Sequence, residues 1–203
     1  LPLFIWMGEI LFRTRLSSDM FKGLSPMLSR LPGGLLHVNV VGCGIMAAVA
    51  GSSAVTCATI GRMSIPELTK RKYDETLSIG SLAGSGTLGL LIPPSIMLIV
   101  YGVLAQQSIS RLFIAGVLPG IMIILIFMSY ISIRSIINPS LAPKEKKRYT
   151  LYEKIIAGKH LFPVIGLIFC VLGSIYGGYA TPTEAATIGV CGALLLAWAT
   201  KTL

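Results

Sequence analysis

Two stretches of small, hydroxylated and proline residues interrupt otherwise apolar sequence and have the chemistry to bind ions. The first is Ala50–Thr56, with the sequence AGSSAVT, and the second is Gly86–Ser95, with the sequence GTLGLLIPPS. Backbone carbonyl and hydroxyl oxygens can replace the water shell of a small hard cation, and the N-terminus of a half-helix can hold a carboxylate. Together the two stretches predict a site for a cation and an anionic solute.

The second stretch must break a helix. Pro93 and Pro94 supply no backbone N–H, and Ile92 and Pro93 each precede a proline, which pushes them out of the α-helical conformation. A non-helical stretch at membrane depth is tolerated only where protein buries it or where it lines a cavity. The alternative explanation for the small residues is close helix packing, as in the GSLAG pattern of Gly80–Gly84.

The composition indicates that transmembrane helices carry these stretches. Of the 203 residues, 54% are hydrophobic and 12% are charged, and the mean hydropathy is +0.80, whereas a soluble domain has about 25% charged residues. This balance excludes an ordinary soluble globule. The net charge of +9 on so apolar a chain indicates basic loops on the cytoplasmic side of a lipid bilayer, not a nucleic-acid surface.

The cysteines and the chain ends carry weaker signals. Cys43, Cys57, Cys170 and Cys191 lie in apolar stretches without metal-ligand spacing, so we expect buried thiols with neither disulfides nor a metal site. The sequence begins at Leu1 inside an apolar run and ends directly after another one, so we expect a fragment of a longer chain.

Charged residues leave five long intervals free, namely 31–61, 76–110, 112–133, 160–183 and 185–200. About 20 apolar residues cross a bilayer as a helix, so each of the last three intervals fits one crossing. The first two are long for one crossing and short for two. They can be assigned by keeping the Lys and Arg residues of the flanking loops on the cytoplasmic side.

This rule favours a re-entrant hairpin over 31–61 and a single crossing by a broken helix over 76–106. Arg111 is then the one positive charge outside, and a helix over 112–134 returns the chain to the cytoplasm. The chain accordingly divides into a first repeat (1–137) that opens with the end of a scaffold helix, a cytoplasmic linker (138–159) and the start of a second repeat (160–203).

Three motifs match the capping box, in which a hydroxyl and a carboxylate three residues later satisfy the free amides at a helix start. They begin at Ser64, Thr150 and Thr181. The first two predict short interfacial helices. The third assigns Glu184 to helix capping, with a proton relay as the alternative. We expect His37 and His160 at the membrane interface.

Five motifs in this order resemble those of a known family: LPGG at 31–34, GSSA at 51–54, IPPS at 92–95 followed by YGV at 101–103, AGVLPG at 115–120, and TPTEAA at 181–186. Together they resemble the DctM-type large permease subunit of the tripartite ATP-independent periplasmic (TRAP) transporters.

The resemblance implies an all-α integral membrane protein with an elevator-type secondary transporter fold. Such subunits have two inverted repeats, each with a re-entrant hairpin and a broken helix. They are multi-pass proteins of the bacterial inner membrane, not enzymes, and they import organic acids such as C4-dicarboxylates or sialic acids. Sodium is the coupling ion and no other cofactor is expected. The implied partners are a small membrane subunit and a periplasmic binding protein that delivers the substrate.

Matching positions transfer the family's site to the two interrupted stretches. The candidate sodium site comprises Gly51, Ser52, Ser53, Thr56, Gly86, Thr87, Gly89 and Pro93. The candidate substrate residues are Ser53, Ala54, Pro94 and Ser95.

Two other functions fit parts of the sequence. A proton-driven or sodium/proton-exchanging anion transporter usually needs an ionisable side chain within the membrane, and 31–61 and 76–110 contain no Asp, Glu, Lys or Arg, which favours sodium held by neutral oxygens. An intramembrane serine hydrolase would use Ser85 with a histidine, but His160 follows Lys159 in a basic loop instead of lying within a span.

Overall fold

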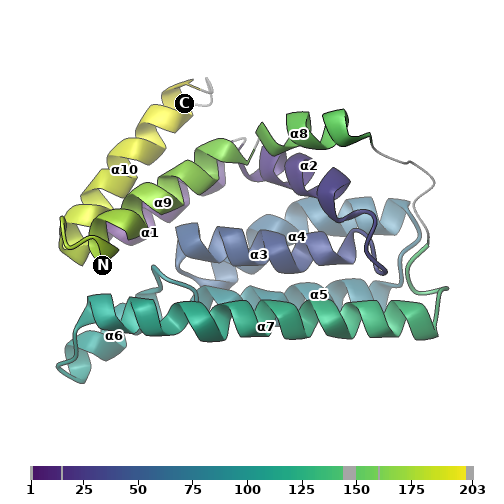
Figure 1. Ribbon diagram of the computed structural model, residues 1–203, viewed down its shortest axis with the longest axis horizontal. Helices are drawn as coiled ribbons and strands as arrows, with labels where there is room; N and C mark the ends of the chain where they lie inside the picture. Colours follow the sequence, from purple (N-terminus) through teal and green to yellow (C-terminus); the bar gives the residue numbers. More distant parts are fainter. Residues whose placement is uncertain (1, 15, 144–149, 160, 200–203) are drawn as a thin grey trace.

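In the computed structural model, which describes residues 2–14, 16–143, 150–159 and 161–199, every regular element is a helix (Figure 1). The all-α class predicted from the sequence is confirmed for this part of the chain. Within the described ranges, two helices are long and apolar enough to cross a membrane by length and composition, α7 (Ile109–Ile137) and α10 (Pro182–Ala199).

A helical hairpin and an interrupted helix form the centre of the molecule. The hairpin consists of α3 (Leu36–Ala50) and α4 (Ser53–Lys70), which pack against each other. The interrupted helix consists of α5 (Glu75–Gly86), a 3-10 turn η1 (Thr87–Leu90) and α6 (Ile96–Leu104). The long helix α7 runs back along α6, α5 and α3 (Figure 1).

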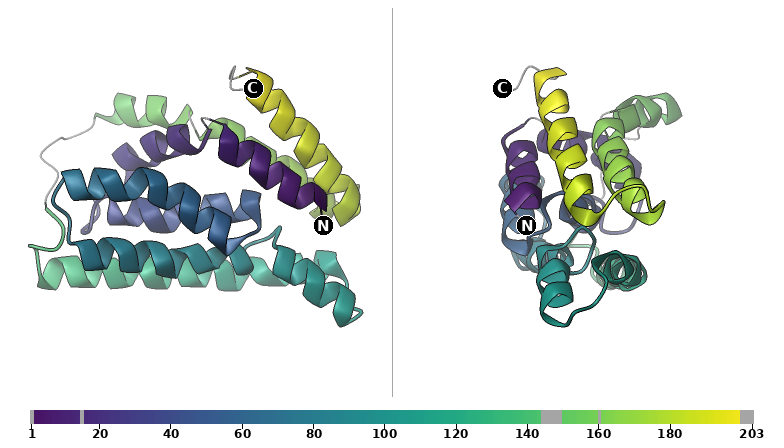
Figure 2. Two further views of the ribbon diagram at one scale, coloured as in Figure 1. Left: turned by 180° about the vertical axis from the view of Figure 1, so that it is seen from behind. Right: turned by 90° about the vertical axis from the view of Figure 1, so that its left-hand side faces the viewer.

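The remaining helices form two groups around α3. In the first, α1 (Pro2–Arg13) packs against α10, which packs against α9 (Phe162–Tyr176) (Figure 2). Helix α9 also contacts α7. In the second, α2 (Leu16–Leu28) lies between α8 (Leu151–Lys159) and the α3–α4 hairpin. The predicted linker 138–159 thus contains a helix, α8, at its C-terminal end. Residues 144–149 of this linker lie outside the described residues.

Burial differs sharply between α3 and α7. All residues of α3 except Val41 and Ile45 are buried, because α1, α2, α4, α5 and α7 surround the helix. By contrast, α7 exposes large apolar side chains along much of its length, with Leu118 77% and Leu125 59% exposed. A long apolar face of this kind suits lipid or another apolar partner.

Three connecting segments gather at one end of the long axis. The α2–α3 and α4–α5 connections and the segment that follows α7 lie at the C-terminal end of α7, whereas the α6–α7 turn beside Arg111 lies at the other end (Figure 1). A backbone hydrogen bond from Asp74 N to Leu141 O (3.0 Å) joins two of these segments.

Helix α4 extends further than the sequence predicts. It continues through Pro66 to Lys70, past residue 61, so the capping box predicted at Ser64 is wrong. Ile60, Ser64 and Leu68 recur every four residues and are all buried. Burial of this stripe holds the helix together although Pro66 lacks a backbone N–H. The helix predicted over 112–134 is also longer in the structure, because Ser108 starts α7 by accepting a bond from Arg111 N (3.5 Å).

The base of the hairpin is a glycine turn. Gly33 and Gly34 have φ values of +100° and +47°, which L side chains rarely adopt. The Tyr73 hydroxyl accepts a bond from Leu35 N (3.3 Å), and burial raises the pKa of this phenol, which keeps it neutral. His37 is fully buried at this base, with Nε2 2.7 Å from Pro32 O, and its interfacial position stays a prediction; His160 lies outside the described residues.

Candidate ion and substrate site

The turn between α3 and α4 takes only two residues. Gly51 has a left-handed conformation (φ +59°), and its N–H donates to Ala47 O at 2.9 Å. Ser52 is extended (φ −135°, ψ 129°), and its side chain makes no capping bond to the start of α4. The small, hydroxylated stretch therefore places a helix C-terminus and a helix N-terminus side by side.

The connection between α5 and α6 is longer and is internally bonded. Leu91 N and Ile92 N both donate to Leu88 O, at 3.0 and 2.9 Å. Beyond the two prolines, Ser95 is extended and fully buried, and its Oγ donates to Leu90 O at 2.7 Å. The chain resumes as a helix at Ile96.

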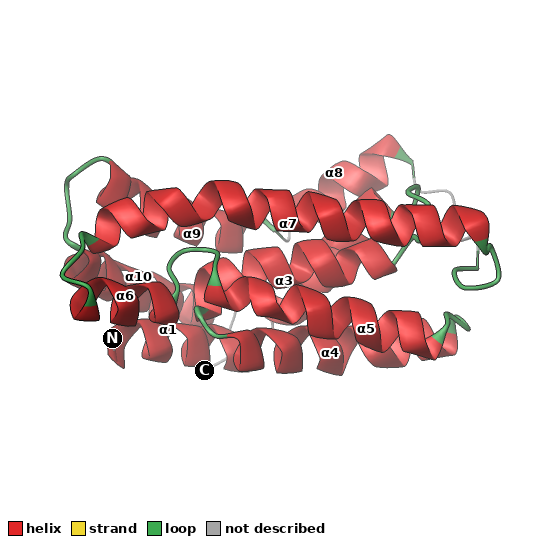
Figure 3. Cartoon of the chain, turned by 90° about the horizontal axis from the view of Figure 1, so that it is seen from below, coloured by secondary structure: helices red, strands yellow, loops and turns green. Residues whose placement is uncertain are grey.

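The two interruptions contact each other directly, and Figure 3 shows both connections as loops beside one another. Ile96 N donates to Gly51 O at 3.2 Å. A Cβ atom on Gly51 would lie 2.6 Å from Pro94 O, and one on Gly89 would lie 2.7 Å from the Ser52 carbonyl carbon. Both distances are shorter than real Cβ contacts, so glycine at these positions is what permits the contact.

Partial charges of both signs meet at this contact. The N-termini of α4 and α6 present backbone N–H groups, and the ends of α3 and η1 present carbonyl groups. No cluster of three or more His, Cys, Asp or Glu side chains occurs among the described residues. The site can therefore attract an anion through amides and a cation through neutral oxygens.

Five of the predicted site residues lie directly at this contact, namely Gly51, Ser52, Ser53, Gly89 and Pro94, and four others differ from them. Thr56 is fully buried and its Oγ1 has no hydrogen-bond partner. Thr87 is exposed, and its Oγ1 donates to Gly84 O at 2.6 Å within its own helix. Ala54 is exposed. Gly86 contacts the hairpin at a different residue, since a Cβ there would lie 3.0 Å from Cys57 Cβ.

A buried polar cluster between α3 and α5 was missed from the sequence. Asn39 is fully buried, its Nδ2 donates to Ser81 Oγ at 3.0 Å, and its Oδ1 has no partner. Ser85 Oγ donates to Ser81 O at 2.6 Å. An amide side chain in a charge-free interval was the available signal, because a polar group is costly in lipid unless it is paired.

Comparison with known proteins identifies the family. The family model described as the tripartite ATP-independent periplasmic transporter, DctM component, matches residues 1–203. The chain belongs to the DctM family. The chain is 33% identical to the ectoine TRAP transporter large permease protein TeaC of Halomonas elongata over 96% of its own length and 45% of that protein.

Two further relatives of this DctM chain are named for different substrates. It is 32% identical to the C4-dicarboxylate TRAP transporter large permease protein DctM of Pseudomonas aeruginosa, over 93% of its length and 43% of that protein. It is 35% identical to the isethionate TRAP transporter permease protein DctMQ of Oleidesulfovibrio alaskensis, over 97% of its length and 31% of that protein. The chain thus spans less than half the length of these relatives.

The relatives are permeases and not enzymes, and the geometry of this DctM chain agrees. Ser85 Oγ bonds to Ser81 O and His37 Nε2 lies against Pro32 O, so neither side chain serves the other as nucleophile and base.

The thiol prediction holds in part: all four cysteines are free, Cys43 is buried, but Cys170 and Cys191 are exposed.

The capping box at Thr181 is confirmed in this DctM chain, and the one at Thr150 is confirmed for its carboxylate half. Thr150 N donates to Glu153 Oε2 at 2.8 Å. Thr181 N and Thr181 Oγ1 both donate to Glu184 Oε2 at 2.8 Å. The carboxylate of Glu184 is therefore engaged in starting α10, as the motif predicts.

Proposed function

We propose that the protein is part of the large transmembrane subunit of a sodium-coupled TRAP transporter that imports a small organic acid across a bacterial inner membrane. Its partners would be a small membrane subunit and a periplasmic binding protein that delivers the substrate. The observation that carries the proposal is the direct contact between the two helix interruptions, marked by the bond from Ile96 N to Gly51 O (3.2 Å).

In this proposal the hairpin tip and the broken helix both supply ligands for the ion and for the substrate. Carbonyl and hydroxyl oxygens from Gly51–Thr56, Gly86–Gly89 and Pro93 would replace the water shell of sodium. Amides at the starts of α4 and α6, beside Ser53, Ala54, Pro94 and Ser95, would hold the acidic group of the substrate. The buried, unpartnered Thr56 Oγ1 supports the cation role, because an unpaired buried hydroxyl is costly unless a ligand uses it.

The alternative coupling ion is the proton. The charge-free sequence of 31–61 and 76–110 supports sodium, since proton-coupled transporters commonly carry an ionisable side chain at the site. The rest of the fold would follow the elevator type, with a second inverted repeat beyond the start at 160–203.

The coupling ion can be tested in proteoliposomes that contain the full-length permease with its small subunit and its binding protein. Ectoine, a C4-dicarboxylate, isethionate and a sialic acid form the substrate panel. We expect uptake of at least one substrate when sodium is high outside, and no uptake when choline replaces sodium under an inward proton gradient. Uptake driven by the proton gradient without sodium would refute sodium coupling.

The site can be tested by removing its hydroxyls. Ser52→Ala combined with Ser53→Ala should raise the sodium concentration for half-maximal uptake about ten-fold, the effect of losing roughly 1.4 kcal/mol of ion binding. Pro94→Ala should act in the same direction, with membrane insertion intact. The matched control is Ser140→Ala, an exposed serine beyond α7. An unchanged sodium dependence in the double variant would contradict the site assignment.

A further inference from the structure

A buried polar layer lies at the junction of α3, α4 and α5, some distance from the two helix interruptions. Asn39 of α3 and Ser64 of α4 are fully buried, and Ser78 and Ser81 of α5 are 4% and 7% exposed. Ser81 precedes Gly89 by eight residues, or about 12 Å along a helix axis. The layer is therefore separate from the proposed ion and substrate site.

Contacts between the helices put the members of this layer at one level. Asn39 Nδ2 donates to Ser81 Oγ at 3.0 Å, which joins α3 to α5. A Cβ on Gly42 would lie 3.4 Å from Ile60 Cδ1, which aligns α3 with α4. Because these two helices run in opposite directions, the turn before Gly42 meets the turn after Ile60. That pairing brings Asn39 to the level of Ser64.

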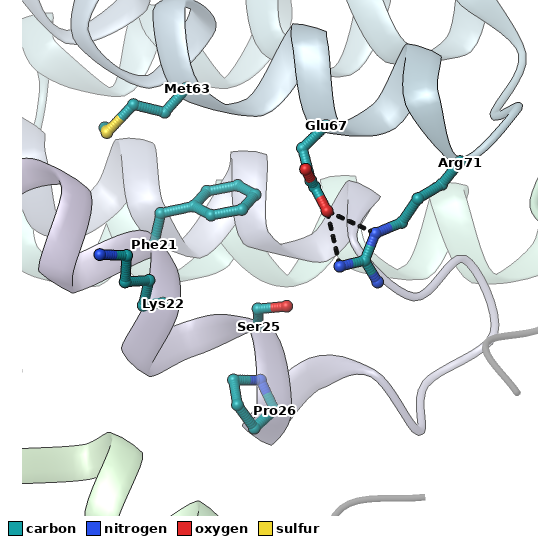
Figure 4. Close-up of a pocket in the computed structure, with 7 residues that line it drawn as sticks. All are labelled: Phe21, Lys22, Ser25, Pro26, Met63, Glu67 and Arg71. Carbon is teal, nitrogen blue, oxygen red and sulfur yellow. Dashed lines mark hydrogen bonds and ion pairs between the residues drawn. The ribbon is translucent and has the colours of Figure 1, made fainter. Parts of the chain in front are cut away.

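Ser64 points toward this junction. A Cβ on Gly61 would lie 2.7 Å from Leu82 Cδ2, so this side of α4 faces α5, while Ile60 faces α3. Ser64 follows both residues by about one turn, which directs its side chain between α3 and α5. Met63 points elsewhere, because it lines a pocket of about 540 Å³ on the α2 side of α4 (Figure 4).

Hydrogen bonds occupy the α5 side of the layer. Asn39 Nδ2 lies 3.4 Å from Ser78 O in addition to its bond with Ser81 Oγ, and Ser81 Oγ donates to Ser78 O at 2.9 Å. By contrast, Asn39 Oδ1 and Ser64 Oγ have no hydrogen-bond partner among the described residues. The α4 side of the layer therefore has one carbonyl oxygen and one hydroxyl available for a ligand.

A single water molecule suits these two atoms. An amide oxygen only accepts hydrogen bonds, whereas a hydroxyl both donates and accepts, so a water can donate to Asn39 Oδ1 and also bond to Ser64 Oγ. Internal waters typically satisfy buried polar groups of this kind. A cation would find two free side-chain oxygens here, since the surrounding backbone lies within helices, and a charge is costly at membrane depth. An apolar ligand would leave both atoms unpaired.

We propose that the polar layer binds one water molecule, which bridges Asn39 Oδ1 and Ser64 Oγ. The bridge completes a chain of hydrogen bonds from α5 through α3 to α4. It ties both arms of the hairpin to the first half of the interrupted helix, and so fixes the register at which Gly89 meets Ser52 further along. The proposal depends on neither the coupling ion nor the substrate of the proposed function.

X-ray radiolytic labelling of the detergent-solubilised full-length permease tests for the water, because radicals formed from a bound water oxidise the side chains beside it. Cys43 is the reporter, since it is fully buried and lies one turn beyond Asn39 on α3. Ser64→Ala should slow Cys43 oxidation about five-fold, the equivalent of roughly 1 kcal/mol for one lost hydrogen bond. The matched control Thr59→Val removes a hydroxyl that already bonds Val55 O (2.7 Å), and should leave the rate unchanged.

Thermal unfolding supplies a second measurement that needs no reporter. Ser64→Ala should lower the unfolding temperature by about 2 °C because the bridge is lost, although alanine is the better helix former. In an Asn39→Leu background the bridge is already absent, so the same substitution should raise the unfolding temperature. The two backgrounds control for helix propensity, since the substitution at Ser64 is identical in both.

Several results would overturn the proposal. If Ser64→Ala raised the unfolding temperature of the wild type, the hydroxyl would have no ligand. If Ser64→Ala lowered stability but left Cys43 oxidation unchanged, Ser64 would bond Asn39 directly and no water would be bound. Should Asn39→Leu fail to fold, the wild type and Ser64→Ala alone still decide. Because neither measurement uses transport, failure of sodium-driven uptake would refute the proposed function and leave this result standing.

Discussion

The two helix interruptions open the backbone in different ways. At the hairpin tip, Gly51 and Ser52 reverse the chain with no side-chain capping bond from Ser52, and nearby Thr56 keeps a buried hydroxyl without a partner. In the α5–α6 connection the chain takes a 3-10 turn and two prolines, and Ser95 Oγ is used to bond Leu90 O. The hairpin tip thus keeps a polar side-chain atom without a hydrogen-bond partner. In the α5–α6 connection, the serine hydroxyl is already hydrogen-bonded within the connection.

This difference suggests a division of roles within the proposed site. The hairpin side would supply ligand atoms, whereas the broken helix would supply a firm wall with two oriented helix ends. The contact between them depends on glycine, because Gly51 and Gly89 each face backbone atoms of the other segment. Variants that separate the two segments, stiffen one or remove hydroxyls from the other can therefore test the division.

The largest effect is expected from Gly89→Ala. The new methyl group would meet Ser52 and Ser53 backbone atoms at 2.7–2.8 Å, which forces the interruptions apart at a cost of about 3 kcal/mol. Thermal unfolding in detergent, with and without sodium, should show lower stability and a smaller sodium-induced stabilisation.

The matched control for that variant is Gly80→Ala, where a Cβ would meet no atom within 4 Å. Alanine is the better helix former, so this control should raise the unfolding temperature. If Gly89→Ala were as stable as the control and kept its sodium response, the contact would not hold the site together.

Ser95→Ala tests the α5–α6 connection, whose serine hydroxyl is hydrogen-bonded internally. It removes the bond to Leu90 O (2.7 Å) at a buried position, so stability should fall by about 2 kcal/mol. Because this hydroxyl serves the fold, the sodium-induced shift in unfolding temperature should remain. A lost sodium response with unchanged stability would show that Ser95 is a ligand instead.

Thr56→Val tests the hairpin side, where the Thr56 hydroxyl has no hydrogen-bond partner. It should change stability in the opposite direction from Ser95→Ala. Valine has a similar shape but no hydroxyl, so removing an unpaired buried polar group should raise stability by about 1 kcal/mol in sodium-free buffer. Sodium should then stabilise the variant less than the wild type. The same unfolding assay in choline and in sodium measures both effects, and lower stability in choline would contradict the interpretation.

Sequence reasoning located both interruptions because their causes are local. Pro93 and Pro94 remove backbone donors, and Gly51 permits a left-handed turn. The order of motifs was specific enough to indicate the family. The same local rules failed at Ser64, where the capping pattern was outweighed by burial of a stripe that includes Ile60 and Leu68.

What sequence reasoning could not supply was contact between distant segments. Nothing near Gly89 in the chain indicates that it faces Ser52, and nothing near Asn39 indicates that its amide bonds Ser81. The residues around His37 in the sequence likewise give no sign that α7 covers it, with Ser132 Oγ 3.4 Å from Nε2. Such pairings depend on how whole helices pack.

The smallest effect is expected from Thr181→Ala, which provides a reference for the comparison. The start of α10 is capped, since Thr181 Oγ1 donates to Glu184 Oε2 at 2.8 Å and lies 3.4 Å from Glu184 N, unlike the start of α4 at Ser52. Losing this cap should lower stability by about 0.5–1 kcal/mol, equally with and without sodium, while the neighbouring Thr183→Ala should be neutral. A sodium-dependent effect at Thr181 would mean that sodium stabilises the whole bundle, and the loss of sodium response in Thr56→Val would then no longer locate the ion at the hairpin tip.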